Sequence, residues 1–241
     1  MTATPRSERG QSHVVGVVLL LGLTAVAMGG LTATVGMLVE DQTASADASR
    51  VASDLDSALR PVETTGYNAG DVSFAAGHLG TEPRQLRVLN DTAIVATVQT
   101  DALVFEADER RVGAVAGAVA RGRGRNTWLT SDPPITSGPD VLVVGAQRLN
   151  GSDAVGGSGG VETTLRTNVT HDRRALGRDE YRVAIETETP AAFESFATRH
   201  DATASTRDID GDGIPSVVIE YDGARTAYLV VHDMRLEVGD G

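Results

Sequence analysis

The sequence contains no cysteine and no lysine, and aromatic residues make up only 4% of its 241 residues. The absence of cysteine excludes a disulfide framework and any cysteine-ligated metal or cluster. With so few aromatic rings, the hydrophobic core has to be built mainly from valine, leucine, alanine and isoleucine. The length allows one domain of ordinary size with an appendage, or two small domains.

All 21 basic residues are therefore arginines, and 33 acidic residues outnumber them to give a net charge of −12. A net anion is repelled by phosphate, so nucleic acid is excluded as a partner. At molar salt the Debye length falls to about 3 Å, and a dense acidic coat then repels itself little. This composition resembles that of proteins from halophilic archaea, which live in brine.

A long apolar run follows the first basic residues. The 26 residues 14–39 carry no charge, and 13 of them are valine or leucine. A helix of that length spans about 39 Å, more than the ~30 Å hydrocarbon core of a bilayer. Because Arg6 and Arg9 precede the run and Glu40 and Asp41 follow it, the positive-inside rule places the N-terminus in the cytoplasm. The sequence thus predicts a single-pass membrane protein with an extracellular head.

A conventional secretion signal is the alternative interpretation of the same run. Arg6 and Arg9 would be its basic region, residues 14–23 its apolar core, and Ala25-Val26-Ala27 a small-x-small cleavage site. Cleavage there would leave twelve further uncharged residues, 28–39, at the new N-terminus. This favours a retained helix, although the sequence leaves the alternative open.

Two patterns indicate that the helix packs against other helices and extends beyond the membrane. Small residues that allow close approach of helix backbones recur at helical spacing: Gly22, Ala25, Gly29, Ala33 and Gly36. Farther on, apolar residues follow the i, i+3, i+4 pattern of an amphipathic helix: Ala48, Val51, Ala52, Leu55, Ala58 and Leu59. We expect one helix from about Ser12 to Leu59, ended by Pro61, with its second half packed on the head.

The stretch "RGQSHVVGVVLLLGLTAVAMGG" resembles the N-terminus of archaeal type IV pilins. In these proteins a prepilin peptidase cuts a short basic leader, the class III signal peptide, just before the apolar helix. The resemblance therefore implies a cut between Gly10 and Gln11, after which the helix stays on the mature protein. It further implies that other pilin-like subunits are partners.

The sequence departs from the commonest haloarchaeal pilin leader, which has Ser-Pro-Val where Ser12-His13-Val14 stands here. It is closer to a group of haloarchaeal pilin-like proteins that share this N-terminal stretch, "ALRPVETTGY" and "TDALVFEADERRV". That group has no assigned biochemical activity.

The remainder of the chain predicts a mainly antiparallel β head, because short segments alternate apolar and polar residues. The expected strands cover residues 85–89, 93–99, 102–107, 111–122, 141–149, 161–169, 181–188, 216–222 and 227–238. One short helix is expected at about 190–199, with Thr189 as its N-cap and Pro190 in its first turn.

The fold class is therefore α+β, with a long N-terminal transmembrane and amphipathic helix before the β head. The expected parts are a leader at 1–10, the helix at 11–60, a β-rich lobe at 61–149, a flexible Gly-rich loop at 150–160 and a second β-rich lobe at 161–241.

Three aspartates in "DIDGDGIPS" follow the pattern of a calcium-binding loop. Asp208, Asp210 and Asp212 occupy positions 1, 3 and 5, and Gly213 supplies the turn at position 6. Position 12 is Ile219 rather than glutamate, so the pattern is incomplete. Calcium in a structural role is the only cofactor that the sequence indicates, and a solvated Asp-Gly turn is the alternative.

Three asparagines match the N-glycosylation pattern: Asn90, Asn150 and Asn168. They predict a glycoprotein, with Asn150 and Asn168 expected to be the most accessible.

Two further stretches resemble functional motifs but are more simply interpreted as loops. "GGSGG" at 156–160 matches Gly-x-Ser-x-Gly but lacks the following helix that a nucleophile elbow needs, which favours a flexible loop. "RGRGRN" at 121–126 favours a solvated hairpin turn over a site for phosphate or an acidic glycan.

The five histidines are scattered along the sequence, without zinc-ligand spacing. The sequence therefore favours a pilin-like surface protein, in pilus assembly or adhesion, over an enzyme. A membrane-anchored ectodomain that binds a ligand without polymerising is the second class. A secreted or anchored hydrolase is the third.

Overall fold

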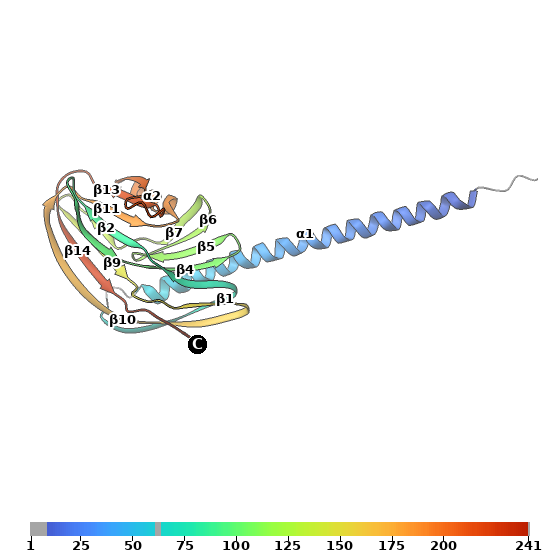
Figure 1. The fold of residues 1–241 in the computed structure, drawn as a ribbon, viewed down its shortest axis with the longest axis horizontal. Helices are drawn as coiled ribbons and strands as arrows, with labels where there is room; N and C mark the ends of the chain where they lie inside the picture. The colour runs from blue at the N-terminus through green and yellow to red at the C-terminus, as the bar shows by residue number, and fades with distance from the viewer. Residues whose placement is uncertain (1–8, 61–63, 241) are drawn as a thin grey trace, which may run out of the picture. The chain divides into compact units, whose positions relative to one another are not determined.

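The computed structural model describes the backbone of residues 9–60 and 64–240 and the side chains of residues 17–31, 42–60 and 64–239. Within the chain, contacts define two compact units, residues 1–43 and 44–241. One helix, α1 (Arg9–Leu59), contributes residues 9–43 to the first unit and residues 44–59 to the second. Figure 1 shows the strands of the head following it.

The end of α1 at Leu59 agrees with the expected boundary. Arg60 immediately precedes Pro61, and the residue before a proline is sterically biased away from helical geometry. Among the described residues, no helix combines the length and the hydropathy needed to cross a membrane. The expected span of 14–39 includes 14–16 and 32–39, whose side chains lie outside the described part.

The head contains a ten-stranded sheet in the order β7-β6-β5-β4-β1-β10-β14-β9-β8, with β15 also paired to β10. Its pairs are antiparallel except for β9 and β14, which are parallel. The strands are β1 (Gly66–Glu82), β4 (Ala102–Ala107), β5 (Arg110–Val115), β6 (Ala118–Arg123), β7 (Asn126–Ser131), β8 (Ile135–Ser137), β9 (Val141–Arg148), β10 (Ala154–Asp179), β14 (Arg225–Asp233) and β15 (Glu237–Asp240).

A second, five-stranded antiparallel sheet has the order β12-β13-β11-β2-β3. Its strands are β2 (Gln85–Leu89), β3 (Ile94–Gln99), β11 (Arg182–Glu186), β12 (Thr203–Arg207) and β13 (Ser216–Glu220). The short helix α2 (Pro190–Arg199) contacts β7, β12 and β13 and buries Phe193 and Phe196.

Two hydrophobic clusters use opposite faces of the ten-stranded sheet. In β4, Ala102 and Val104 join the cluster shared with α2 and the five-stranded sheet. Leu103 and Phe105 join the cluster shared with residues 44–59 of α1. Because successive strand residues point to opposite faces, the ten-stranded sheet is a middle layer covered on both sides.

The expectation of a mainly antiparallel β head is confirmed, and α2 matches the expected helix at 190–199. Thr189 is the N-cap residue, but its side chain makes no capping hydrogen bond. Its hydroxyl instead lies 3.0 Å from the hydroxyl of Thr187. The expected single strand at 111–122 is two strands, β5 and β6, separated at Ala116 and Gly117, which both have positive φ.

The division into two lobes, 61–149 and 161–241, is wrong. Each sheet contains strands from both halves, which pair directly with one another: β1 with β10, β2 with β11, and β9 with β14. Contacts accordingly place the whole of 44–241 in one unit.

The expected flexible loop at 150–160 is also wrong for its second half, because residues 154–160 begin β10. The glycines there allow close packing against β1 rather than flexibility. A Cβ added at Gly156 would lie 2.9 Å from Nδ1 of His78, and one added at Gly80 would lie 2.9 Å from Nε2 of the same ring.

Candidate functional site

The side of the ten-stranded sheet against which residues 44–59 of α1 pack is here called the docking face. Every apolar position predicted for the amphipathic half of the helix is buried: Ala48, Val51, Ala52, Leu55, Ala58 and Leu59. The sheet contributes Phe74 and Phe105, whose ring centroids lie 4.9 Å apart. Burying a valine or leucine side chain contributes about 1.5–3 kcal/mol, so Val51, Leu55 and Leu59 together fix the helix firmly.

Close approach of the helix to the docking face depends on Gly70 in β1. A Cβ added there would lie 2.6 Å from the Cβ and 2.9 Å from the Cα of Ala58. Contacts under 3.0 Å to backbone atoms require the helix or the strand to move. A glycine in the strand and an alanine in the helix therefore let the two backbones meet.

Polar contacts fix the helix in register. Asp47 is buried, and its Oδ2 accepts a hydrogen bond of 2.8 Å from the backbone N–H of Ala75. That N–H is free to point at the helix because the β1–β10 register shifts between Phe74 and Ala76. At the end of the helix, Nε2 of the buried Gln147 donates a 3.0 Å hydrogen bond to the carbonyl of Leu59, one of the carbonyls that a helix leaves without an internal partner.

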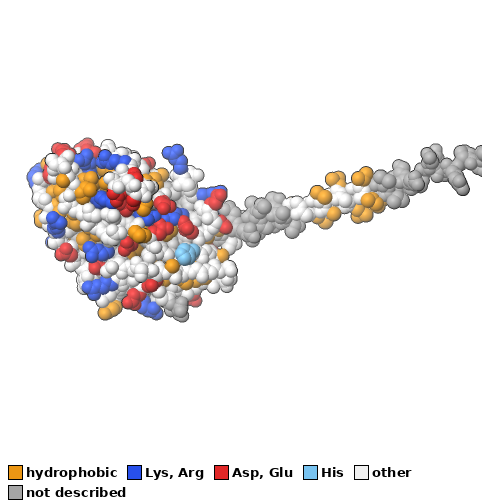
Figure 2. Space-filling view, viewed as in Figure 1, with side chains coloured by type: hydrophobic (Ala, Val, Ile, Leu, Met, Phe, Trp, Pro, Cys, Tyr) orange, Lys and Arg blue, Asp and Glu red, His pale blue; other side chains and the backbone are white. Residues whose placement is uncertain are grey.

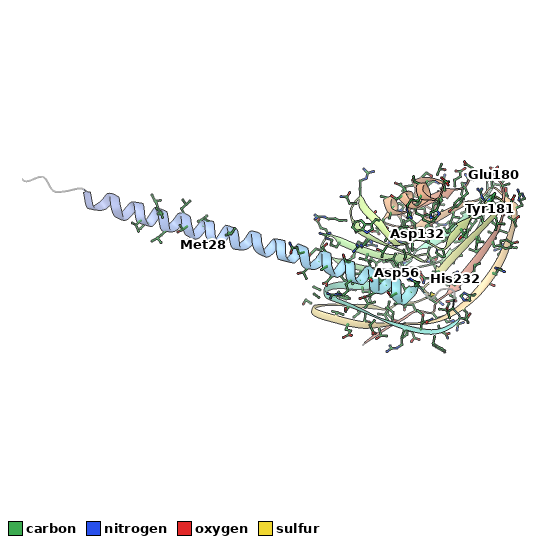
Figure 3. The ribbon with its side chains drawn as sticks, turned by 180° about the vertical axis from the view of Figure 1, so that it is seen from behind. Met28, Asp56, Asp132, Glu180, Tyr181 and His232 are labelled. Atoms are coloured by element: carbon green, nitrogen blue, oxygen red, sulfur yellow. The ribbon has the colours of Figure 1, made fainter. Side chains whose placement is uncertain are left out.

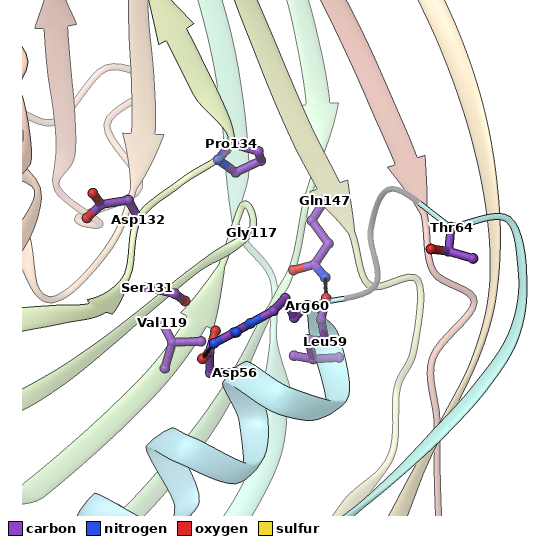
Figure 4. A pocket seen from close by; sticks show the side chains of 10 residues that line it. All are labelled: Asp56, Leu59, Arg60, Thr64, Gly117, Val119, Ser131, Asp132, Pro134 and Gln147. Atoms are coloured by element: carbon purple, nitrogen blue, oxygen red, sulfur yellow. Dashed lines mark hydrogen bonds and ion pairs between the residues drawn. The ribbon is translucent and has the colours of Figure 1, made fainter.

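A cavity of about 490 Å³ adjoins this end of α1 (Figure 4). It is lined by Asp56, Leu59, Arg60, Thr64, Gly117, Val119, Ser131, Asp132, Pro134 and Gln147. Both carboxylates in the lining are held by arginines. Asp56 forms an ion pair with Arg60, and Asp132 accepts hydrogen bonds of 2.8 and 3.1 Å from Arg199. These hydrogen bonds lower the pKa of Asp132 below its ordinary value and keep it ionised.

The three aspartates of the predicted calcium loop do not converge on one point. Both carboxylate oxygens of Asp208 accept backbone hydrogen bonds, 2.7 Å from Gly211 and 3.0 Å from Gly213. Asp210 and Asp212 instead gather with Glu186 of β11, with one oxygen of each within 4.8 Å of the others. Asp208 thus holds the turn through backbone hydrogen bonds, and both the calcium site and the solvated Asp-Gly turn stay predictions.

Arg87 of β2 joins these acids to form what we call the acid–arginine cluster: Arg87, Glu186, Asp210 and Asp212. Its guanidinium lies 2.5 Å from Glu186 and 2.5 Å from Asp210. Arg87 and Glu186 are only 3% and 2% exposed. Burial raises the pKa of Glu186, and the hydrogen bond and charge of Arg87 oppose that rise. The arginine thus supplies positive charge at a place where three carboxylates would otherwise repel one another.

Sequence reasoning missed one pair of side chains, His171 and His232. They are separated by 61 residues but face each other across β10 and β14, with their Nδ1 atoms 3.0 Å apart. Sequence motifs for metal ligands are recognised by short spacings between the ligands. Two histidines that strand pairing brings together from distant parts of the chain have no such spacing in the sequence. Alternation places each histidine on one face of a strand, but pairing two distant strands needs the structure.

The predicted glycosylation residues lie in different settings. Asn150 is exposed, whereas Asn168 lies within β10 opposite Tyr67 of β1. The side-chain nitrogen of Asn90, the atom that would carry a glycan, donates a 2.8 Å hydrogen bond to Asp179. Asn150 is therefore the most accessible of the three, and its side-chain nitrogen makes a longer hydrogen bond, 3.4 Å to Asp233, than that of Asn90.

In the first unit, the large apolar side chains between Val17 and Leu31 are all exposed, by 56% to 74%. Figure 2 shows these side chains as an orange stretch of the helix. Of the predicted packing stripe, Gly22 and Gly29 have open space where a Cβ would be, and Ala25 is exposed. The side chains of Ala33 and Gly36 lie outside the described residues. So do those of Gly10 and Gln11, the predicted cleavage pair, whose backbone belongs to α1.

The glycine motif and the arginine stretch have ordinary structural roles. Ser158 of "GGSGG" pairs with Ala76 inside the β1–β10 ladder, and β10 continues after it to Asp179. In the hairpin of β6 and β7, Arg121 lies over the ring of Trp128, 5.0 Å from its centroid.

Residues 9–237 match the model of a family described as "Family of unknown function (DUF7289)". No curated protein and no solved structure matches the chain significantly.

Proposed function

We propose that this chain, which belongs to the DUF7289 family of unknown function, is a pilin-like, membrane-anchored surface protein of a halophilic archaeon. A prepilin peptidase would trim it after Gly10. The retained helix then holds the head at the cell surface, or joins the helices of other pilin-like subunits in a pilus. The observation that carries this proposal is the exposed apolar stretch of α1.

Nine large apolar side chains on fifteen successive residues of one helix are unsuited to water. They are Val17, Val18, Leu19, Leu20, Leu21, Leu23, Val26, Met28 and Leu31. Contiguous apolar surface of this kind marks contact with a membrane or with partner proteins. Lipid covers it in an anchored monomer, and the same stretch of neighbouring copies covers it in a filament. The exposed Gly22, Ala25 and Gly29 favour close helix contacts in the second case.

The other half of the helix supports the same proposal because it is part of the head. A helix that serves as anchor or filament shaft has to carry its domain without detaching from it. Here the docking face holds residues 44–59 by apolar packing, by Asp47 on the strand backbone and by Gln147 on the last carbonyl.

The first experiment identifies the N-terminal residue of the mature protein by mass spectrometry of material from the native host's envelope. A start at Gln11 is the expected result. A start at Met28 would establish secretion after signal-peptide cleavage and would overturn the proposal. A start at Met1 or Thr2 would contradict trimming, and the protein would then be a simple membrane-anchored ectodomain.

A pair of variants links trimming to the predicted site. Gly10→Val should abolish trimming because it alters the residue before the cut, while Gly22→Val, beyond the site, should leave it intact. Trimming of the Gly10→Val chain at the same bond would contradict recognition by a prepilin peptidase.

A further inference from the structure

The two histidines of the head that face each other across β10 and β14 form a ready chelating pair. His171 and His232 are direct partners in the antiparallel ladder, and their rings are nearly perpendicular, at 86°, with centroids 5.0 Å apart. The Nδ1 atoms lie 3.0 Å apart. Figure 3 labels His232 among the strands of the sheet.

We infer that this pair binds a divalent transition-metal ion, with copper(II) preferred, through the two Nδ1 atoms. Metal–imidazole bonds are about 2.0–2.1 Å long, so nitrogens 3.0 Å apart subtend an angle of about 90–97° at a shared ion. That is the angle between neighbouring ligands in square-planar or tetragonal coordination, which Cu²⁺ and Ni²⁺ adopt with nitrogen and oxygen ligands. Copper(II) is preferred because the affinity of nitrogen ligands for divalent first-row ions is highest at copper.

The setting of the pair allows an ion to enter. His232 is buried and lies between β10 on one side and β9 on the other, whereas His171 is exposed, so its ring can rotate once its hydrogen bond to His232 opens. That rotation directs both lone pairs to one point on the solvent side. Water molecules complete the coordination, since the pair supplies two ligands.

Protons balance in the binding step. With both rings neutral, the 3.0 Å contact requires one Nδ1 to carry the proton and the other to accept it. When the ion binds, the donor ring loses its Nδ1 proton to water and gains one on Nε2. No net proton is released, and both imidazoles stay neutral, as a metal ligand requires.

Two charged side chains near the pair, among the residues that the structure describes, are turned to other partners. The next side chain on the same face of β10 is Arg173, and its guanidinium lies over the ring of Tyr228, 6.0 Å from the centroid. Asp233 is one residue from His232 and points to the other face, where it contacts Arg148 and Asn150. The net charge of −12 attracts cations to the molecule as a whole.

The bound ion would join β10 to β14 and thereby stabilise the folded head, because it binds the folded chain and only weakly the unfolded one. This role belongs to the head alone and does not depend on how the N-terminal helix is processed.

The experiment titrates the purified, detergent-solubilised full chain with CuCl₂, NiCl₂ and ZnCl₂ by calorimetry. Electron paramagnetic resonance of the copper complex gives the coordination geometry. We expect one site that binds Cu²⁺ more tightly than Ni²⁺ and Zn²⁺ least, with a tetragonal spectrum that shows nitrogen ligands. His171→Asn and His232→Asn should each weaken Cu²⁺ binding by about tenfold or more, since even changes to outer-shell partners cost that much.

The matched controls are His78→Asn and the double variant Asp210→Asn/Asp212→Asn, which remove a histidine and two of the three acid–arginine carboxylates elsewhere in the head. Both should bind copper like the unaltered chain. Copper should also raise the melting temperature of the unaltered chain but not that of His171→Asn. Because the side chain of His171 is exposed, this substitution should not disturb the fold, so a lost copper effect would report on metal binding. Unchanged copper affinity in His171→Asn, loss of binding in either control, or Zn²⁺ binding as tight as Cu²⁺ would overturn the inference.

Discussion

The docking face and the acid–arginine cluster stabilise two parts of the head in opposite ways. The docking face buries small and aliphatic side chains against residues 44–59 of α1 and includes two carboxylates that accept hydrogen bonds from β1 backbone N–H groups, Asp47 from Ala75 and Asp54 from Ser73. The acid–arginine cluster lies on the face of the five-stranded sheet opposite Leu86 and Val88 and depends on ion pairs of a buried arginine.

The two regions differ in the interaction that stabilises them: the docking face depends mainly on apolar burial, and the acid–arginine cluster depends on ion pairs. Apolar contacts respond little to pH, and salts that are excluded from protein surfaces strengthen them. A buried ion pair depends on the protonation of its acids and becomes costly when one partner is removed. The apolar part of the contact that fixes the helix to the head therefore tolerates changes of pH, and Asp47 and Asp54 are the carboxylates in that contact.

The largest effect is expected at the cluster. Arg87→Met should lower the free energy of unfolding of the head by about 3–5 kcal/mol, because Glu186 would keep a buried charge without its cation. Urea unfolding followed by circular dichroism measures it. Arg182→Met, which removes a part-exposed arginine of the same sheet, is the control and should cost much less. Equal costs for the two variants would show that burial of Arg87 is unimportant.

At the docking face, Leu55→Ala should cost about 2–5 kcal/mol, since it leaves a cavity between the helix and the sheet. Leu20→Ala removes the same atoms from the same helix at a position that is 67% exposed and should leave unfolding of the head unchanged. Urea unfolding of both variants in detergent tests the comparison directly. A matching loss of stability in Leu20→Ala would contradict the division of the helix into an exposed and a docked half.

A smaller effect is expected from closing the space between the helix and β1. Gly70→Ala should cost about 1–3 kcal/mol, because the added methyl group overlaps Ala58. Gly113→Ala in β5 is matched to it, since a Cβ there meets nothing within 4 Å. Thermal unfolding of the two variants should show a lower melting temperature only for Gly70→Ala; a similar loss in both would indicate a general cost of alanine in the sheet.

The smallest expected effect is a change of the free energy of unfolding with pH. Because the pKa of Glu186 is raised in the folded chain, the folded state keeps that proton to higher pH than the unfolded state. The contribution of Glu186 to stability should therefore fall as pH rises from its ordinary pKa, 4.5, to the folded value. Urea unfolding at a series of pH values should show that Glu186→Gln removes this part of the slope, while Leu55→Ala retains it. A slope that is unchanged in Glu186→Gln would assign it to another group.

Much of the head was predictable from local pattern, and its assembly was not. β2 and β4 have the expected bounds because each is a short apolar segment bounded by turn residues. β1 was missed, since "GYNAGDVSFAAGHLGTE" contains four glycines and three alanines, and only pairing with β10 makes it a strand. The Gly-rich stretch at 154–160 was misjudged for the same reason, as strand pairing outweighed low intrinsic propensity.

The candidate functional residues were also predictable only where they lie close together in the sequence. The docked half of α1 was predicted residue by residue because helical periodicity reports directly on one buried face. Asp210 and Asp212 were predicted as ligand candidates, but Glu186 and Arg87 come from other strands and belong to the cluster only through the fold. His171 and His232 are likewise joined by register.

The spread of the docked contacts has a mechanical consequence. Residues 44–59 of α1 are sixteen residues, about 24 Å of helix, and buried positions occur along their whole length from Ala44 to Leu59. A tensile load on the N-terminal end of this segment, directed along its axis, acts on all these contacts in shear. They share the force and resist together, whereas contacts peeled apart one by one would fail in turn. The force that the attachment withstands therefore grows with the length of helix that is docked on the head.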